Sequence, residues 1–172
     1  MRSVEGARIY LAGFDVFRAD ADEHGDYLKA LCREQGMEGL HPFDNEVRGG
    51  LPMGERASLI CRLNMQMIRD ADAVLANLNL FRGDEPDSGT AFEVGMAVAL
   101  GKPVWAYFEQ CGAMREWIAG DGQGRDARGF WIEDFGLPRN LMLACSWAGC
   151  SGTVEDAVAA LSRYLNGLLA EG

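Results

Sequence analysis

Residues 72–108 read DAVLANLNLFRGDEPDSGTAFEVGMAVALGKPVWAYF, and this stretch decides the fold class. It opens with an almost wholly apolar run, DAVLANL, which is typical of a parallel strand covered on both faces. A loop rich in Gly, Pro and Asp follows, and then an apolar helical segment that ends at Gly101. Lys102 and Pro103 lead into a second apolar run, VWAYF. A strand–helix–strand unit of this kind predicts a parallel sheet.

The same alternation extends in both directions along the chain. We therefore predict a doubly wound α/β fold, with the whole chain, residues 1–172, forming a single domain. The predicted helix over 54–70 has an inward stripe formed by Leu59, Ile60, Leu63, Met67 and Ile68. The pattern weakens from 109 to 138, where we expect a short helix and a long excursion. The remaining predicted elements are strands at 8–13, 38–43 and 140–149 and helices at 25–36 and 153–169.

Composition excludes several classes of protein. The formal net charge is -10, so polymeric nucleic acid is not expected as a partner, because binding it requires a basic face. No apolar run reaches the ~18 residues of a membrane-spanning helix, and no signal-peptide pattern is present, so we expect no membrane partner and a cytoplasmic location. The five cysteines form no CxxC pair and are expected to be reduced thiols, and the two histidines have no metal-ligand spacing.

Two carboxylates in the loop and helix after the central strand carry the candidate chemistry. In a doubly wound sheet, ligands bind beyond the carboxyl ends of the strands, which places Gly13, the 44–50 connection and the 79–90 loop on one rim. Glu93, near the predicted start of a helix, could be held ionised by the helix dipole and attack an electrophilic carbon. Asp87 could then deliver a proton to the leaving group, as in retaining glycosidic chemistry.

Each of these residues also has a structural interpretation. Thr90 and Glu93 match a capping box, in which Glu93 would bond to the backbone at the helix start. Asp87, after a proline, could bond its own turn. Tyr10, near the end of the first strand, could pack in the core, or its hydroxyl could orient the Glu93 carboxylate through a charge-assisted hydrogen bond.

Several segments together resemble one enzyme family. They are IYLAG at 9–13, DNE at 44–46, NMQMIRDADAVLANL at 64–78, FRGDEPDSGTAFEVG at 81–95 and FGLPRNLML at 135–143. In this order they are similar to the nucleoside 2-deoxyribosyltransferases, and more to the trypanosomatid-like branch than to the lactobacillar branch. The resemblance implies a flavodoxin-like, three-layer α/β/α fold with a sheet of about five strands.

The resemblance also implies a reaction, in which the base of a 2'-deoxyribonucleoside is exchanged for a free purine or pyrimidine. Glu93 would be the nucleophile that forms a deoxyribosyl ester, and Tyr10 would orient it. Asp87 would protonate or hydrogen-bond the departing base and then help the incoming one. No metal and no organic cofactor are implied. Further residues that the resemblance implies in substrate binding are Gly13, Phe17, Glu46, Asn64, Gly89, Asn140 and Met142.

Some of these positions bear on specificity and assembly. Glu46 and Asn64 fall where the lactobacillar branch carries a base-contacting Gln and Asp, so they leave the base preference open. Asn140 and Met142 match residues that reach the sugar 5'-hydroxyl in a neighbouring subunit's site, which implies a homo-oligomer, a dimer or higher, with shared sites. Two alternatives remain: an N-glycoside hydrolase acting on nucleoside 5'-monophosphates, for which Arg139 would be the nearby cation, and a non-catalytic nucleoside-binding module.

Overall fold

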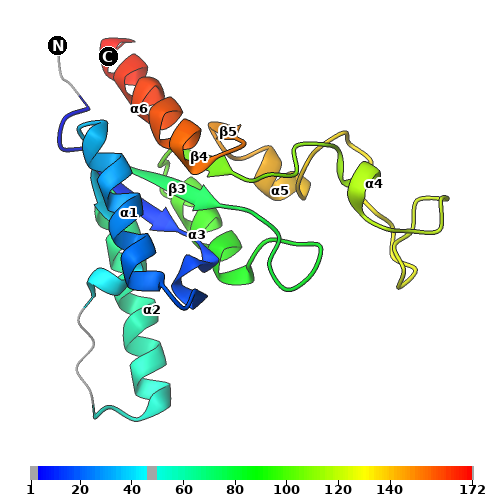
Figure 1. Cartoon of the computed structure of the whole chain (residues 1–172), viewed down its shortest axis with the longest axis horizontal. Helices are drawn as coiled ribbons and strands as arrows, with labels where there is room; N and C mark the ends of the chain where they lie inside the picture. The colour runs from blue at the N-terminus through cyan, green and yellow to red at the C-terminus, as the bar shows by residue number, and fades with distance from the viewer. Residues whose placement is uncertain (1–3, 46–49, 172) are drawn as a thin grey trace.

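The computed structural model describes residues 4–45 and 50–171, and it contains a five-stranded, fully parallel sheet (Figure 1). The strand order is β2-β1-β3-β4-β5, so the chain winds outward from β1 in both directions. This is the flavodoxin-like order of a doubly wound sheet, and the predicted fold class is confirmed. The strands are β1 (Arg8–Ala12), β2 (Glu38–Leu40), β3 (Ala73–Asn77), β4 (Val104–Tyr107) and β5 (Gly149–Ser151).

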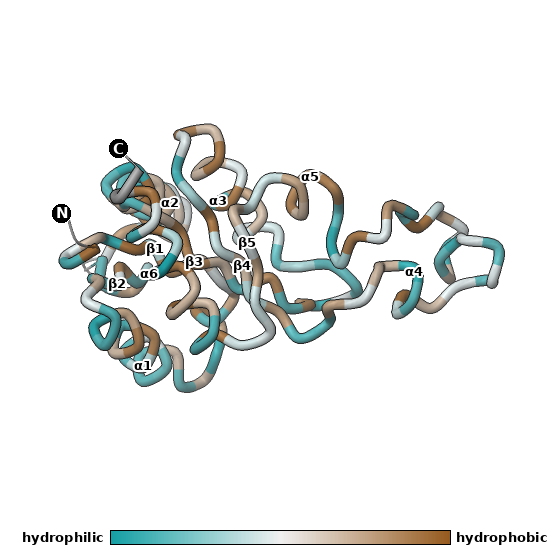
Figure 2. The backbone as a smooth tube through the Cα atoms, turned by 90° about the horizontal axis from the view of Figure 1, so that it is seen from above, coloured by the Kyte–Doolittle hydropathy of each residue, from teal (hydrophilic) through white to brown (hydrophobic). Residues whose placement is uncertain are grey.

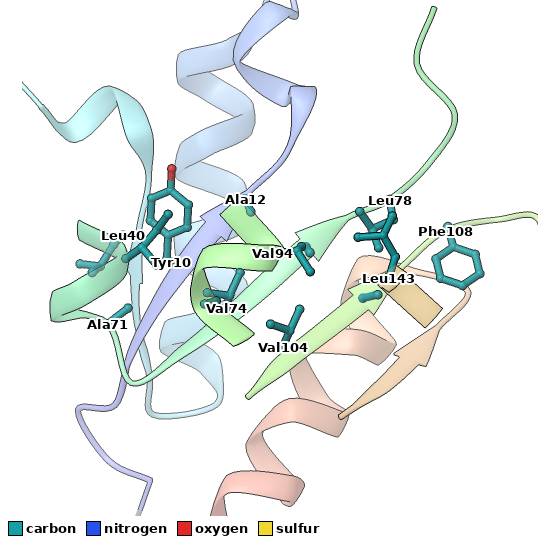
Figure 3. Close-up of a cluster of buried hydrophobic side chains, with 14 residues drawn as sticks. Tyr10, Ala12, Leu40, Ala71, Val74, Leu78, Val94, Val104, Phe108 and Leu143 are labelled. Atoms are coloured by element: carbon teal, nitrogen blue, oxygen red, sulfur yellow. The ribbon is translucent and has the colours of Figure 1, made fainter. Parts of the chain in front are cut away.

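Helices cover both faces of the sheet and give three layers. Because side chains alternate along a strand, Ile9 and Leu11 of β1 face one layer, whereas Tyr10 and Ala12 face the other. The Ile9 face packs on α1 (Ala21–Glu34) and α6 (Val154–Glu171). The Tyr10 face packs on α2 (Met53–Asp70), α3 (Ser88–Ala99) and the four-residue helix α5 (Leu141–Ala144). Figure 3 shows this second cluster, with Tyr10 of β1 next to Leu40, Leu143 of α5 next to Leu78, and Val94 of α3 between these two pairs.

Two segments extend away from the sheet. The 109–138 segment contains only the short helix α4 (Met114–Trp117) and forms an arm that projects from the body in both views (Figures 1 and 2). Its outer end is held by isolated bridges, Gly120 to Asp126 and Arg125 to Trp131. The expected short helix and long excursion are confirmed. No helix in the described ranges is long and apolar enough to cross a bilayer.

Three predictions from the pattern are wrong. The second strand does not extend over 38–43, because it ends at Leu40 and Pro42–Asp44 form a short 3-10 helix. The last strand does not lie over 140–149, because LMLA within that range folds as α5. Strand β5 begins only at Gly149, the final residue of the predicted range. The predicted inward stripe of α2 is buried completely only at Ile68, while Ile60 is 37% exposed. The first turns of α2 extend past the sheet in Figure 1, so nothing in the described part of the chain covers them.

Candidate functional site

The central contact of the site is a hydrogen bond of 2.6 Å that the Tyr10 hydroxyl donates to Glu93 Oε1. The two residues are 83 positions apart in the sequence. β1 holds Tyr10 in the core with no exposed surface, while Glu93 on α3 stays partly exposed. Burial raises the pKa of Glu93 to about 7; the Tyr10 hydrogen bond opposes this rise, and the charge of Asp87 adds to it. Burial, followed by the charge of Glu93, raises the pKa of Tyr10, so the phenol remains a donor. The pair therefore forms a carboxyl group that ionises near neutral pH and is held in one orientation.

The start of α3 differs from the capping-box interpretation. The helix begins at Ser88, its N-cap is Asp87, and Asp87 Oδ2 accepts from the Thr90 amide at 2.9 Å and the Thr90 hydroxyl at 3.0 Å. Glu93 is the sixth residue of the helix and bonds to Tyr10, not to the helix start. The expectation of a carboxylate held ionised by the helix dipole is also wrong, because Glu93 lies beyond the first turn, where that effect fades, and its pKa is raised.

The two carboxylate oxygens of Asp87 allow it a structural role in the turn and a role toward a ligand at the same time. It caps α3 through Oδ2, while its charge still acts on Glu93. Within the described part of the chain, Asp87 Oδ1 makes no hydrogen bond, so this oxygen can face a ligand. Gly89 follows closely, and a Cβ added there would lie 3.0 Å from Asp87 Oδ2. A larger residue at 89 would therefore disturb the oxygen that forms the cap.

An aromatic stack lies at the end of β1 and continues into the 79–87 loop. The Phe81 ring is stacked with Phe14 at 4.7 Å between centroids and with Phe17 at 5.5 Å. Phe17 remains 59% exposed. Gly13 makes the turn into this segment possible, because a Cβ there would lie 2.5 Å from Asp15 Oδ2. The stack thus presents one open ring at the rim of the sheet.

Asn64 of α2 lies in a cavity of about 360 Å³, next to Asn45 and the half-exposed Phe43. Its side-chain oxygen accepts from Asn45 Nδ2 at 3.2 Å. The cavity also includes Val16, the neighbour of Phe17. Glu46, predicted to contact the base, lies outside the described residues.

Asn140 is the N-cap of α5, and Met142 is the second residue of that helix. Asn140 caps α5 by accepting from the Met142 amide at 3.0 Å, and its Nδ2 group donates to Glu133 of the arm. The cavity that Asn140 lines is about 490 Å³; Phe81 and Arg82 of the loop before α3 also line it, whereas Glu93 and Asp87 do not. The Met142 side chain is 73% exposed. Within one chain, these two residues are not part of the arrangement around Glu93.

Arg139, the cation that a phosphate-binding alternative requires, is buried and bonded to backbone carbonyl groups. Its side chain is 1% exposed and donates to the carbonyl oxygens of Leu78 at 2.8 Å, Pro138 at 2.6 Å and Gln110 at 3.1 Å. The guanidinium carbon also lies 4.2 Å from the centre of the Phe108 ring. Arg139 therefore fixes the start of the arm and is not open to a ligand.

The sequence did not predict a buried polar cluster at the carboxyl ends of the strands. Asp15 is 6% exposed; it accepts from Asn77 Nδ2 at 2.9 Å and lies 3.2 Å from His24 Nε2. Burial and the nearby Asp15 raise the pKa of the Tyr107 phenol well above its ordinary value. The signal for this cluster was Asn77, a polar residue at the end of an apolar strand. The cluster ties the turn after β1 to the ends of β3 and β4, which fixes the base of the aromatic stack.

Comparisons with known proteins identify relatives of similar sequence and fold. A 2-deoxyribosyltransferase from Leishmania mexicana has a similar structure, with a TM-score of 0.78, 36% identity, and coverage of 92% of this chain and 98% of that one. A 2-deoxyribosyltransferase from Bacillus psychrosaccharolyticus shares the fold at a TM-score of 0.58 and 22% identity, with coverage of 87% and 89%. An uncharacterised protein of Schizosaccharomyces pombe is 32% identical, with coverage of 78% of this chain and 74% of its own.

The family comparison covers most of the chain, including β1, α3 and the start of α5. The model that describes nucleoside 2-deoxyribosyltransferases matches residues 9–142, which contain Tyr10, Asp87, Glu93 and Asn140. The chain belongs to the nucleoside 2-deoxyribosyltransferase family.

Proposed function

We propose that this protein exchanges the base of 2'-deoxyribonucleosides with a free purine or pyrimidine through a covalent deoxyribosyl-Glu93 intermediate. The observation that carries the proposal is the Tyr10–Glu93 hydrogen bond of 2.6 Å, on a carboxyl group whose pKa is raised to about 7. A carboxylate poised near neutral pH and held in one orientation has the properties of a nucleophile.

In the first half of the reaction, Glu93 attacks the anomeric carbon of the sugar. The bond from that carbon to the base nitrogen breaks and an ester bond to Glu93 forms; the protonated form of the Asp87 carboxyl group gives its proton to the leaving base and becomes a carboxylate. Positive charge develops on the sugar in the transition state, and the nearby carboxylate stabilises it. A 2-deoxy sugar lacks the electron-withdrawing 2'-hydroxyl, so this charge develops more readily.

In the second half, a nitrogen of the incoming base attacks the same carbon and the ester bond breaks. The Glu93 carboxylate is regenerated, and Asp87 takes up the proton that the incoming base loses. We place the bases against the open ring of Phe17, at the end of the stack with Phe81 and Phe14. Gly13 gives that segment its close approach to the sheet, and Asn64 lines the neighbouring cavity.

The proposal also covers the domain that acts and the assembly of its subunits. We propose that the whole chain acts as one domain, in a homo-oligomer in which Asn140 and Met142 of one subunit complete the sugar site of another. The 73% exposure of Met142 supports this arrangement.

The competing activity is hydrolysis of nucleoside 5'-monophosphates, for which a cation would have to meet the phosphate. The burial of Arg139 and its three carbonyl partners favour the transferase.

The test is incubation of the protein with thymidine and adenine, followed by chromatography. Transferase activity gives deoxyadenosine and thymine, whereas hydrolysis of a monophosphate gives free base and sugar phosphate. Mass spectrometry of intact protein with thymidine alone should detect one deoxyribosyl group, and the Glu93→Gln variant should not carry it. Failure to form a new deoxyribonucleoside with every purine and pyrimidine acceptor tried, hypoxanthine included, would overturn the proposed transfer.

A further inference from the structure

Arg82 occupies an unusual place beside the aromatic stack. Its guanidinium carbon lies 4.5 Å from the centre of the Phe81 ring and 5.2 Å from that of Phe17. Both distances fall within the range of cation–π contacts. The residue is exposed, in the loop between β3 and α3 that also carries Asp87 (Figure 1).

The backbone at Arg82 is held in a conformation that favours glycine. Its φ is 57°, and no other non-glycine residue in the described ranges has a positive φ. The turn is closed by a hydrogen bond of 2.9 Å from the Phe81 amide to the Glu85 carbonyl oxygen. Side chains rarely adopt this conformation unless their surroundings enforce it, and such residues gather at ligand sites. The chain therefore presents an arginine where a glycine would fit with less strain.

The donors of Arg82 are not used by the protein. Across residues 4–45 and 50–171, no carboxylate forms an ion pair with Arg82 and no side-chain hydrogen bond from it is found, although Asp84 and Glu85 follow closely. A guanidinium carries N–H donors in a planar fork. The ring faces hold this fork beside Phe17, and its donors remain available to a ligand.

We propose that Arg82 selects the base, by donating two N–H groups to the adjacent O6 and N7 acceptors of a 6-oxopurine stacked on Phe17. This inference rests on the proposed function, because it takes the open face of Phe17 as the place of the base. Arginine forms this bidentate pair with a purine that carries O6 and N7. Adenine places an amino donor where the second acceptor is needed, and pyrimidines lack N7. The preferred free bases are therefore hypoxanthine and guanine.

The experiment measures binding of free bases by calorimetry, so it does not depend on turnover. Wild-type protein is titrated with hypoxanthine, adenine and 7-deazahypoxanthine, which lacks the N7 acceptor. We expect hypoxanthine to bind about tenfold more tightly than each of the other two, the scale of one bidentate pair. Arg82→Ala should reduce this ratio to within about twofold, and Arg82→Lys, which keeps the charge but loses the fork, should also lose most of it.

A matched control is Arg33→Ala, at an exposed arginine in the last turn of α1, which should keep the wild-type ratio. The far-ultraviolet circular dichroism of each variant confirms that it is folded. An unchanged ratio in Arg82→Ala, an equal loss for all three bases, or no binding of any base to wild-type protein would overturn the inference. Selective binding without base exchange would refute the proposed transferase and leave the role of Arg82 standing.

Discussion

At the scale of single residues, Glu93 has to satisfy two opposing requirements if it is the nucleophile that we propose. A nucleophile must be ionised, yet a carboxylate that is fully hydrated reacts poorly. Burial raises the pKa of Glu93 to about 7, and the Tyr10 hydroxyl limits that rise by stabilising the charged form. Tyr10 thus allows a partly dry carboxyl group to be ionised at neutral pH.

This balance predicts the pH dependence of base exchange. Because only ionised Glu93 attacks in the proposed reaction, kcat/KM should rise with pH through an apparent pKa near 7. Tyr10→Phe removes the hydrogen bond that lowers the pKa of Glu93, so the rise should move to higher pH. The measurement is the rate of thymidine-to-deoxyadenosine conversion from pH 5 to 9 (a range that brackets an ordinary carboxyl and a raised one). A profile unchanged by Tyr10→Phe would remove Tyr10 from the site.

The same pKa makes a prediction about stability. Between the ordinary pKa of 4.5 and the folded value of about 7, the folded protein binds more protons at Glu93 than the unfolded chain does. The free energy of unfolding therefore falls as pH rises through this window. Glu93→Gln does not titrate, so its free energy of unfolding, relative to wild type, should rise by about 2 kcal/mol from pH 4 to pH 8 once partial exposure is allowed for. Urea denaturation of both proteins at the two pH values measures this change, and parallel behaviour would contradict it.

At the scale of elements, α3 links the two carboxyl groups, because Asp87 caps the helix and Glu93 lies in its second turn. Asn is as good an N-cap as Asp, whereas Ala is not. Asp87→Asn should therefore keep the stability of wild type but slow base exchange strongly, since an amide cannot protonate the departing base. Asp87→Ala should be slow and also less stable, by about 1 kcal/mol. Urea midpoints and kcat separate the two effects, and a fast Asp87→Asn variant would limit Asp87 to its capping role.

The ends of these elements show how far the sequence could predict the fold. The bounds of the long apolar segments, such as strand β3 and helix α3, were predicted within a few residues. LMLA at 141–144 is four apolar residues, too short for its period to separate helix from strand. Thr90 and Asp87 are both good cap residues near the start of α3, and only the backbone decides between them.

The sequence pattern alone predicted less of the candidate site than of the fold. Nothing local connects Tyr10 with Glu93, because the contact depends on how β1 lies against α3. The family resemblance supplied that pairing as an expectation. It did not supply Arg82, whose significance depends on its backbone angle and on two ring distances.

At the scale of the whole molecule, charge and apolar surface are distributed unevenly. The chain has a net charge of -10, yet α2 and α3 together carry three acidic residues and three arginines. The outer side of α3 exposes Phe92 (57%) and Val98 (37%), and the early turns of α2 are uncovered. Two copies of an acidic protein repel each other least where the local charge cancels, so this side is the expected contact between subunits.

Size-exclusion chromatography with light scattering tests that contact. Wild-type protein should elute as a dimer or larger, and Val98→Glu should shift it toward monomer by placing a charge in the apolar contact. The control is Leu168→Glu, at an exposed leucine of α6 on the opposite face of the sheet, which should leave the assembly unchanged. A monomeric wild-type protein that exchanges bases at full rate would refute the shared site.

If subunits share sites, two inactive variants should rescue each other. Glu93→Gln keeps Asn140 intact, and Asn140→Ala keeps Glu93 intact, so a mixed dimer holds one site with both native residues. Random mixing at equal concentrations makes half of the dimers mixed, each with one working site, and the mixture should recover about a quarter of the wild-type activity. The dimers must first be dissociated in mild denaturant and reassembled together, and each variant treated alone serves as the control. Rescue requires that Asn140 acts across the subunit boundary, because a site built within one chain would leave the mixture as inactive as its components.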